Sequence, residues 1–276
     1  MNEPPPPDFF CFGPPKSGTT MLQRMLSLHP QVSCPSEHHF RALLELFRQG
    51  FAAYNAHLAL RDRWTGAQGA TPIGPETQEA VWAAAVARIV RDAGAGKPIC
   101  GANDNELMEK PELIAGHFPR SRLIAIFRHP LDQAHSAWHA LHRLAEREED
   151  PRHLALLERH GDFAGWARFI ARRYVVQLTL LLRTCRAQPL LLLRYEAVCA
   201  DPQGELGRVF AFLGAACDAA TLAAIAETSR FDRARAASAD PGFFHRGPAG
   251  YEAPAALRRE VEGLAGAAMR RLGYRL

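Results

Sequence analysis

The chain has 276 residues, of which 47% are hydrophobic and 22% are charged, and its formal net charge is +4. This length and composition can bury one large core. No apolar stretch approaches the ~20 residues that cross a bilayer. No basic run is interleaved with aromatic residues in the way that marks a nucleic-acid surface. A membrane-spanning or nucleic-acid-binding function is therefore not expected.

The N-terminus and the cysteines indicate the cellular compartment. The first ten residues, MNEPPPPDFF, lack the charged-then-apolar pattern of a secretory signal. The six cysteines have no C-x-x-C spacing and lie mostly in apolar contexts, so we expect small core residues in a reducing compartment. The Ala- and Arg-rich composition suggests a bacterium with a GC-rich genome. We therefore expect a cytoplasmic, bacterial protein.

Strand and helix patterns alternate along the chain. Short apolar runs predict strands at 9–13, 31–34, 97–101, 122–127 and 190–194. Helical patterns fall at 19–28, 38–50, 76–93, 132–147, 163–186, 203–213, 219–227 and 254–272. This alternation predicts an α/β fold with a central parallel sheet covered by helices on both faces. No linker or repeat interrupts it, so we expect a single domain over residues 1–276 with ligands at the carboxyl ends of the strands.

The first predicted strand runs into a turn and a helix with the sequence FFCFGPPKSGTT, residues 9–20. The first N–H groups of a helix have no intrahelical partner, and the macrodipole adds positive charge in front of them. Lys16 adds a full charge, and Gly18 allows close approach of the backbone. Further donors come from the hydroxyls of Ser17, Thr19 and Thr20. The stretch therefore predicts a site for a phosphate-like anion.

The position of the lysine distinguishes one kind of phosphate loop from another. An NTP-binding loop reads G-x-x-x-x-G-K-[ST], and Gly13 and Gly18 have that separation, but Thr19 stands where the lysine belongs. PKSGTT, with Lys16 inside the loop, resembles the 5′-phosphosulfate loop of the sulfotransferases that use 3′-phosphoadenosine 5′-phosphosulfate (PAPS). The resemblance implies a P-loop-NTPase-like sulfotransferase fold and PAPS as co-substrate, with 3′-phosphoadenosine 5′-phosphate (PAP) as product. It assigns donor contacts to Pro15, Lys16, Ser17, Gly18, Thr19 and Thr20.

The stretch around the second predicted strand reads SLHPQVSCPSEHHF, residues 27–40. It resembles the heparan-type pattern of leucine-histidine-proline followed by glutamate-x-histidine-phenylalanine, in branches that act on glycans or protein tyrosine with a glutamate as general base. Glu37 matches that glutamate, and His39 and Phe40 match its neighbours. The resemblance implies Glu37 as the base, with His39 beside it. His38 or His39 could instead take the role, and Glu37 could be a helix N-terminal carboxylate that the dipole stabilises.

The third predicted strand continues as GANDNE, residues 101–106. Cytosolic small-molecule sulfotransferases carry a base histidine just after this strand, usually in a lysine-threonine-histidine context. This chain has no histidine there, so that assignment does not transfer. Asp104 or Glu106 could instead line the acceptor side.

The fourth predicted strand, RLIAIF at 122–127, is followed directly by Arg128, His129 and Pro130. An arginine at the carboxyl end of a strand and a serine two turns along the next helix can grip one phosphate from two sides. RHPLDQAHSAW resembles the family's 3′-phosphate motif, in which a serine follows the arginine by eight positions. Arg128 and Ser136 have this spacing, which implies that they bind the 3′-phosphate of the donor.

Three later stretches resemble family motifs in the same order. LLLLRYE, residues 190–196, resembles a strand whose final tyrosine lies near the adenine. TSRF, residues 228–231, resembles a threonine-serine-phenylalanine segment with one residue inserted, and FFHRGPAG, residues 243–250, resembles the loop that completes the 3′-phosphate site. These resemblances assign donor contacts to Tyr195, Thr228, Ser229, Phe231, Arg246 and Gly247.

Three histidines, His135, His139 and His142, share one face of a predicted helix. No carboxylate or cysteine lies at ligand spacing from them, and sulfuryl transfer needs no metal. We therefore expect no metal site.

Together these patterns predict in-line transfer of the sulfuryl group from PAPS to a hydroxyl of a glycan, a peptidyl tyrosine, a lipid or a small molecule. Lys16 would stabilise the leaving phosphate and Glu37 would act as base. A nucleotide kinase or NTPase on the related loop fold is an alternative, disfavoured by the lysine position and by the lack of a clear magnesium-holding aspartate. A non-catalytic nucleotide-binding module is another. The polar residues 145–162 could be a solvated loop or an acceptor-side lid.

Overall fold

The computed structural model describes residues 4–65, 71–94, 96–146, 151–230 and 250–276. Five strands form one parallel sheet in the order β2-β3-β1-β4-β5. The strands are β1 (Phe9–Phe12), β2 (Val32–Ser33), β3 (Ile99–Asn103), β4 (Arg122–Phe127) and β5 (Leu190–Arg194). The predictions for β4 and β5 are confirmed residue for residue. The other three strands begin or end one or two residues away from their predicted bounds.

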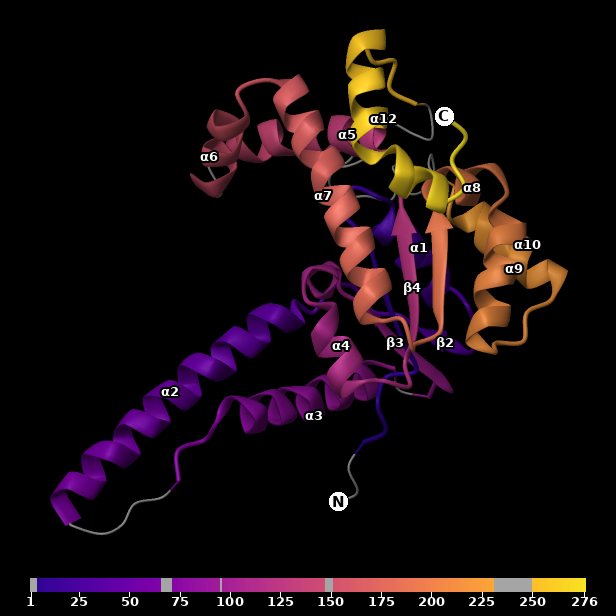
Figure 1. Cartoon of the computed structure of the whole chain (residues 1–276). Coiled ribbons are helices and arrows are strands. Elements are labelled where there is room, and N and C mark those ends of the chain that lie inside the picture. The colour runs from indigo at the N-terminus through magenta and orange to yellow at the C-terminus, as the bar shows by residue number, and fades with distance from the viewer. Residues whose placement is uncertain (1–3, 66–70, 95, 147–150, 231–249) are drawn as a thin grey trace.

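Helices cover both faces of this sheet and form its connections. They are α1 (Thr19–Ser27), α2 (Phe40–Thr65), α3 (Pro75–Ala93), the 3₁₀ helix η1 (Asn105–Glu109), α4 (Pro111–His117), α5 (Pro130–Glu146), α6 (Pro151–His160), α7 (Phe163–Thr184), α8 (Tyr195–Ala200), α9 (Pro202–Leu213), α10 (Ala219–Thr228) and α12 (Ala255–Arg271). The arrowheads of β4 and β5 point toward α12, and the N-terminus lies at the opposite end of the sheet (Figure 1). The predicted α/β architecture is confirmed.

Alternate side chains of each strand enter two different hydrophobic layers. Phe10 and Phe12 of β1 pack with α3, α4, α5, α7 and α12 on one face. Phe9 and Cys11 pack with α1, α8, α9 and α10 on the other. All four residues of β1 are buried. A strand covered on both faces needs a continuous apolar run rather than an alternating one, which is why FFCF forms the central strand.

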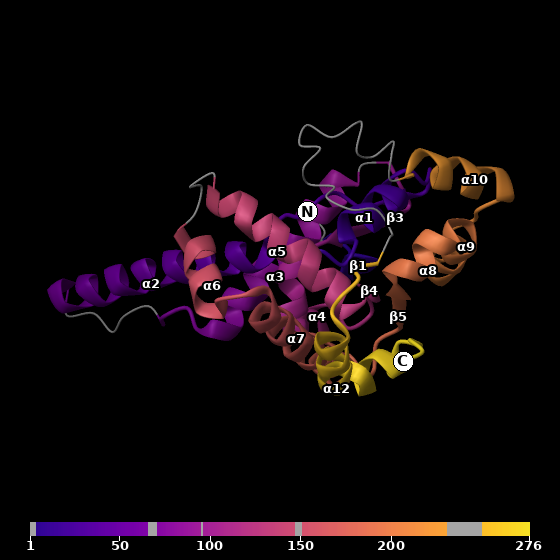
Figure 2. The ribbon, with the colours of Figure 1, turned by 90° about the horizontal axis from the view of Figure 1, so that it is seen from above.

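The helices α2 and α3 extend side by side away from the sheet (Figures 1 and 2). The helix predicted at 38–50 in fact continues to Thr65. Buried Leu44 and the partly buried Phe47 belong to the same hydrophobic layer as Trp82 of α3. Beyond residue 50, the Asn55 amide bonds to the backbone of Ile73 in the segment before α3, so contacts outside the predicted range accompany the longer helix.

The prediction of a polar loop at 145–162 was wrong for most of the segment. Glu146 still belongs to α5, and residues 151–160 form α6. Pro151 occupies the first helical position, where its missing N–H costs nothing. Leu156 and Leu157 pack against the hydrophobic layer of α5 and α7, so an apolar stripe stabilises this charged helix.

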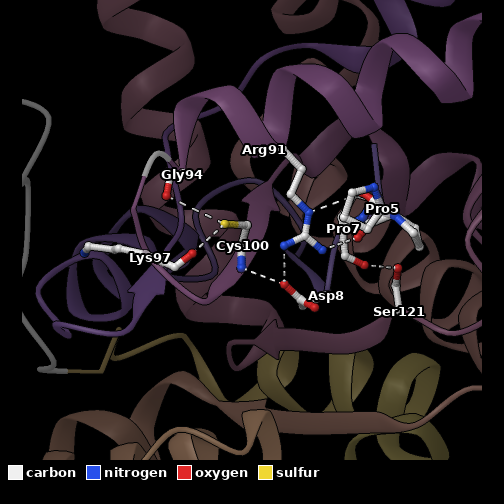
Figure 3. A network of polar contacts seen from close by, with 9 residues as sticks. Pro5, Pro7, Asp8, Arg91, Gly94, Lys97, Cys100 and Ser121 are labelled. Atoms are coloured by element: carbon white, nitrogen blue, oxygen red, sulfur yellow. Dashed lines mark hydrogen bonds and ion pairs between the residues drawn. The ribbon is translucent and has the colours of Figure 1, made fainter. Parts of the chain in front are cut away.

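Polar contacts fasten the N-terminal segment to the amino ends of the strands (Figure 3). The guanidinium of Arg91 on α3 donates to the carbonyl oxygens of Pro5 and Pro6 and pairs with Asp8 at 2.9 Å. The same Asp8 oxygen accepts from the backbone N–H of Cys100 at 2.8 Å. The neighbouring Ser121 hydroxyl donates to the Pro7 carbonyl at 2.5 Å. This network fixes the entry of the chain into β1.

The cysteines match their predicted role in part. All six are free, and those at positions 11, 34, 100 and 185 are buried. The other two, Cys199 and Cys217, are half-buried. Within the described parts of the chain, no helix has both the length and the apolar composition needed to cross a membrane.

Candidate active site

The loop between β1 and α1 has a backbone that only a glycine suits at one position. Gly18 precedes α1 with φ of 101°, in the left-handed region. A Cβ atom on Gly18 would lie 2.4 Å from Cδ2 of Tyr195, and one on Gly13 would lie 2.3 Å from the carbonyl oxygen of Ile126. The loop is therefore pressed against β4 and α8, at the carboxyl edge of the sheet where α1 begins.

Ser17 is the most deeply buried polar residue of this loop. Its exposed fraction is 0%, and its hydroxyl has no hydrogen-bond partner among the described residues. A buried hydroxyl without a partner costs about 1–3 kcal/mol. A ligand that supplies acceptor oxygens removes that cost, so the loop fits the phosphate-like anion that the sequence predicts.

Arg128 and Tyr195 join this loop to the next two strands. Arg128 follows β4, is 7% exposed, and has an Nε that contacts no acceptor in the described part of the chain. Its Cζ lies 4.5 Å from the ring centroid of Tyr195, the first residue of α8. Because Tyr195 also lies against Gly18, one side chain contacts two of the predicted motifs. Burial raises the pKa of Tyr195, so its hydroxyl stays protonated at neutral pH.

Gln133 connects the first turn of α5 to residues 13–18, the loop between β1 and α1, which we call the anion loop after its predicted ligand. This residue is 3% exposed, and its Nε2 donates to the carbonyl oxygen of Pro15 at 3.1 Å. Ser136 lies one turn further along the same helix and is half-buried; its predicted contact with the 3′-phosphate stays a prediction. The sequence analysis missed Gln133. The available signal was its place three residues before Ser136, which puts both on one helix face.

Glu196 holds the turn that follows Arg128. One carboxylate oxygen accepts from the backbone N–H of His129 at 2.7 Å, and the other accepts from the hydroxyl of Tyr274 at 2.7 Å. The sequence analysis gave Glu196 no role beyond its place in the tyrosine-glutamate motif. These contacts show that it connects the end of β4 to the C-terminal segment.

The remaining donor residues fall at or beyond the end of α10. Thr228 is the last residue of α10 and is exposed, and Ser229 follows it. The Ser229 hydroxyl is buried and has no partner within the described residues. Phe231, Arg246 and Gly247 lie outside the described residues.

Glu37 lies in the segment between β2 and α2, and Asn105 connects it to the anion loop. The Asn105 amide accepts from the backbone N–H of Gly13 at 3.1 Å and donates to the Thr19 hydroxyl at 3.1 Å. It also donates to Oε1 of Glu37. The structure therefore brings Glu37 to the start of α1. Sequence reasoning missed Asn105, although a polar residue just after a parallel strand lies at the ligand-binding edge.

The surroundings of Glu37 favour its neutral form. Burial raises the pKa of Glu37, the nearby charges of Asp104 and Glu106 raise it further, and His39 lowers it. Such a balance is typical of a carboxylate with a role in proton transfer. His39 is exposed, has φ of 54°, and its Nδ1 lies 3.4 Å from Oε1 of Glu106. The ring of exposed His38 stacks on Phe40, with centroids 5.3 Å apart.

Asp104 and Glu106 both cap the start of α2, and the expectation that one of them lines the acceptor side stays a prediction. Asp104 is 1% exposed and accepts from the backbone N–H of Phe40 at 2.7 Å. Glu106 accepts from the backbone N–H of Ala42 at 3.2 Å. Carboxylates at a helix N-terminus complement its dipole, so this pair holds the helix that follows Glu37. Burial raises the pKa of Asp104.

The histidines of α5 form a pair in the structure. His135 and His139 approach one another with their Nε2 atoms 3.2 Å apart. Across the described ranges, no group of three or more histidine, cysteine, aspartate or glutamate residues could hold a metal ion.

The structure is an α/β protein whose predicted anion loop lies at the carboxyl edge of a parallel sheet. A family model described as the sulfotransferase family matches residues 7–219. The chain therefore belongs to the sulfotransferase family and is an enzyme that transfers sulfuryl groups. This membership confirms the family that the motifs predict.

Solved structures share the fold at low sequence identity. The sulfotransferase domain of the Synechococcus PCC 7002 olefin synthase is 20% identical with a TM-score of 0.55, covering 100% of this chain and 97% of that one. A sulfotransferase from Alicyclobacillus acidocaldarius is 18% identical with a TM-score of 0.53, covering 97% and 94%. Mouse sulfotransferase SULT7A1, complexed with PAP, is 14% identical with a TM-score of 0.52, covering 99% and 88%. No curated protein sequence matches the chain.

Proposed function

We propose that this sulfotransferase uses PAPS as donor and transfers its sulfuryl group to an acceptor hydroxyl, releasing PAP. The observation that carries the proposal is the position of Tyr195, which contacts both Gly18 and Arg128. It joins the predicted 5′-phosphosulfate, 3′-phosphate and adenine motifs at one edge of the sheet. The PAP complex of the mouse protein with the same fold supports this choice of donor.

The buried polar atoms of the site fit such a donor. The hydroxyl of Ser17 and the Nε of Arg128 are buried without partners among the described residues, and both are donors that a phosphate oxygen satisfies. In the proposal, Pro15 to Thr20 hold the 5′-phosphosulfate, and Arg128 with Ser136 holds the 3′-phosphate. Lys16 and the N-terminus of α1 stabilise the negative charge that grows on the bridging oxygen as its bond to sulfur breaks.

Glu37 is the proposed base for the acceptor. As the acceptor oxygen bonds to sulfur, its proton passes to the Glu37 carboxylate. The link from Glu37 through Asn105 to Thr19 supports this role, because it places the carboxylate beside the loop that holds the reacting group. His39 lies beside the base and also pairs with Glu106. The acceptor is a hydroxyl of a glycan, a peptidyl tyrosine, a lipid or a small molecule.

A calorimetric titration with PAP tests the donor, with ATP plus magnesium as comparison. We expect tight binding of PAP without metal, and a loss of about tenfold to a hundredfold in affinity for Arg128→Ala, because hydrogen bonds to charged groups contribute about 1.5–3 kcal/mol. Arg91→Ala is the matched control, since Arg91 lies in the network at the opposite end of the sheet (Figure 3). A preference for ATP with magnesium would contradict the proposal and favour a phosphotransferase.

Glu37→Gln tests the base separately from the donor site. We expect this variant to bind PAP like the wild type while releasing no PAP from PAPS in the presence of a panel of sugars, phenols, alcohols and tyrosyl peptides. Full transfer by the variant with an acceptor that the wild type uses would eliminate Glu37 and leave His38 and His39 as the candidates. PAP binding with no transfer by the wild type to any acceptor would favour a non-catalytic module.

A further inference from the structure

The side-chain amide of Asn105 uses both of its donors and its carbonyl oxygen within the candidate active site. An asparagine amide has two N–H donors and one carbonyl acceptor. The backbone N–H of Gly13 faces the carbonyl oxygen at 3.1 Å. Because that N–H can only donate, the NH₂ group must face the other way. Its two donors meet the hydroxyl of Thr19 and the carboxylate of Glu37, so the chemistry of the partners determines the amide orientation.

These three partners belong to the two halves of the proposed reaction. Gly13 and Thr19 lie at either end of the loop that would hold the donor, and Glu37 is the base that would act on the acceptor. Asn105 itself begins η1, directly after Asp104, which caps α2. One side chain from the β3 edge therefore touches the donor loop and the base together.

We propose that Asn105 is a positioning residue for sulfuryl transfer, which holds the Glu37 carboxylate at the start of α1 and ties it to the donor loop. The inference rests on the proposed function for the identity of the base and of the loop. Asn105 does not exchange a proton or contact a reacting atom in this account. It determines where the carboxylate stands relative to the loop.

The charges around Glu37 explain why a donor is needed there. Burial and the carboxylates of Asp104 and Glu106 raise the pKa of Glu37, whereas His39 and a hydrogen bond from the backbone of Asn105 lower it. A general base must be ionised before it can accept a proton. The one side-chain N–H of Asn105 that faces Glu37 also stabilises the ionised form of Glu37 and so opposes the effect of the two neighbouring carboxylates.

Asn105→Asp is the sharpest test because it preserves shape and reverses one contact. An aspartate keeps an oxygen for the N–H of Gly13 and replaces the NH₂ group that faces Glu37 by a second oxygen. The matched control is Asn55→Asp. The Asn55 amide also bridges backbone groups, bonding to the carbonyl oxygen and the N–H of Ile73 at 3.0 and 2.8 Å, but it lies in the α2–α3 hairpin.

The readout is a carbon-13 NMR titration of the glutamate carboxyl groups in the full chain, with the Glu37 signal assigned by its loss in Glu37→Gln. We expect the midpoint of Glu37 to move to higher pH in Asn105→Asp and to stay in place in Asn55→Asp. Calorimetry with PAP should show an affinity change of less than about tenfold in Asn105→Ser, which loses only the Gly13 and Thr19 contacts of the loop and adds no charge beside the bound anion. A smaller upward movement is expected for Asn105→Ser, which removes the amide without adding a charge.

An unchanged Glu37 midpoint in both Asn105 variants would overturn the proposal. Lost PAP binding with an unchanged midpoint would also overturn it, because Asn105 would then serve the donor loop alone. If Asn105→Asp fails to fold, the Asn105→Ser titration decides in the same way. The failure of the proposed function looks different: the wild type would not bind PAP, or Glu37→Gln would transfer normally, while the effect of Asn105 on the Glu37 midpoint would remain measurable.

Discussion

The two ends of the sheet differ in whether particular hydrogen-bond donors find acceptors within the described part of the protein. At the amino end, Nζ of Lys97 donates to the carbonyl oxygens of Ser27, His29 and Val32 at 2.8–3.0 Å. At the carboxyl end, the Ser17 hydroxyl and the Arg128 Nε are buried with no partner in the described residues. The donor at the amino end is a half-buried ammonium group, and those at the carboxyl end are a buried hydroxyl and a buried guanidinium N–H. They differ in whether the protein itself supplies the acceptor.

This difference separates stability from function within one sheet. Donors whose acceptors are built into the fold stabilise it at all times, as Lys97 does by closing the end of α1. Donors left without acceptors lower stability until a ligand arrives, and binding then stabilises the folded protein. Substitutions at the amino end should therefore change the free energy of unfolding, and substitutions at the carboxyl end should change binding and catalysis.

The largest expected effect comes from exchanging a lysine at each end. Lys16→Ala should reduce transfer by about 10²- to 10³-fold, because a preorganised charge aimed at the leaving oxygen typically contributes that much. Lys97→Met should leave PAP affinity unchanged and lower the free energy of unfolding by about 1–3 kcal/mol, because three carbonyl groups lose a charged donor. PAP release from PAPS and urea unfolding measure the two quantities. Near-normal transfer by Lys16→Ala would contradict the assignment of catalysis to the carboxyl end of the sheet.

A pair of glycines with left-handed backbones tests whether the contact between Gly18 and Tyr195 shapes the site at the carboxyl end. Gly18 has φ of 101°, and a Cβ there would lie 2.4 Å from Tyr195, whereas Gly214 after α9 has φ of 77° with nothing within 4 Å. Gly214→Ala should cost only the strain of the left-handed conformation, about 1–2 kcal/mol, and retain PAP binding. Gly18→Ala should suffer the same strain and also displace Tyr195, so we expect at least about a tenfold loss of PAP affinity by calorimetry. Equal PAP affinities in the two variants would mean that the Tyr195 contact does not shape the site.

Strands could be predicted from the sequence wherever their residues form a continuous apolar run. RLIAIF gave β4 with correct bounds because a strand covered on both faces is apolar throughout. LLLLR gave the edge strand β5, which is mostly half-buried, because it too is a continuous apolar run that ends at a charged residue. The pattern failed where a helix is held by tertiary contacts. The helix α6 has three charged residues and two histidines among its ten residues, and Leu156 and Leu157 pack it against the hydrophobic layer. The short helices α4 and α8, with seven and six residues, offer too few turns to show a period.

Site residues could be predicted from the sequence where they belong to a recognisable motif. They were missed where their role depends on a contact with a residue distant in sequence. Gly18 stands at the start of α1, Arg128 and Tyr195 each directly follow a strand, and the structure brings the three together. Asn105 and Gln133 bind backbone groups that are distant in sequence; the Asn105–Gly13 bond, for example, spans 92 positions. No local spacing encodes such a pair, so contacts of this kind become visible only when the strands are placed side by side.

The smallest expected effect is a pH dependence of stability at the amino end. His29 is 0% exposed; its Nε2 bonds to the carbonyl oxygen of Ala216 at 3.1 Å, and its Nδ1 accepts from the N–H of Gln31 at 3.1 Å. These contacts require the neutral ring, and burial lowers the pKa of His29 below its ordinary value of 6.5. The unfolded chain therefore takes up a proton more readily than the folded one, so stability falls as the pH drops below 6.5.

Urea unfolding at a series of pH values between 7.5 and 5.5 measures this loss, with His29→Gln as the test and His57→Gln, at an exposed position on α2, as the control. The His29 variant should be less stable at pH 7.5 and should lose less stability on acidification than the wild type, whereas the His57 variant should follow the wild type. An identical pH slope in His29→Gln would place the acid sensitivity in other groups. The contribution of His29 comes from contacts made entirely within the protein, so it should persist in Lys16→Ala, in which the opposite end of the sheet is impaired.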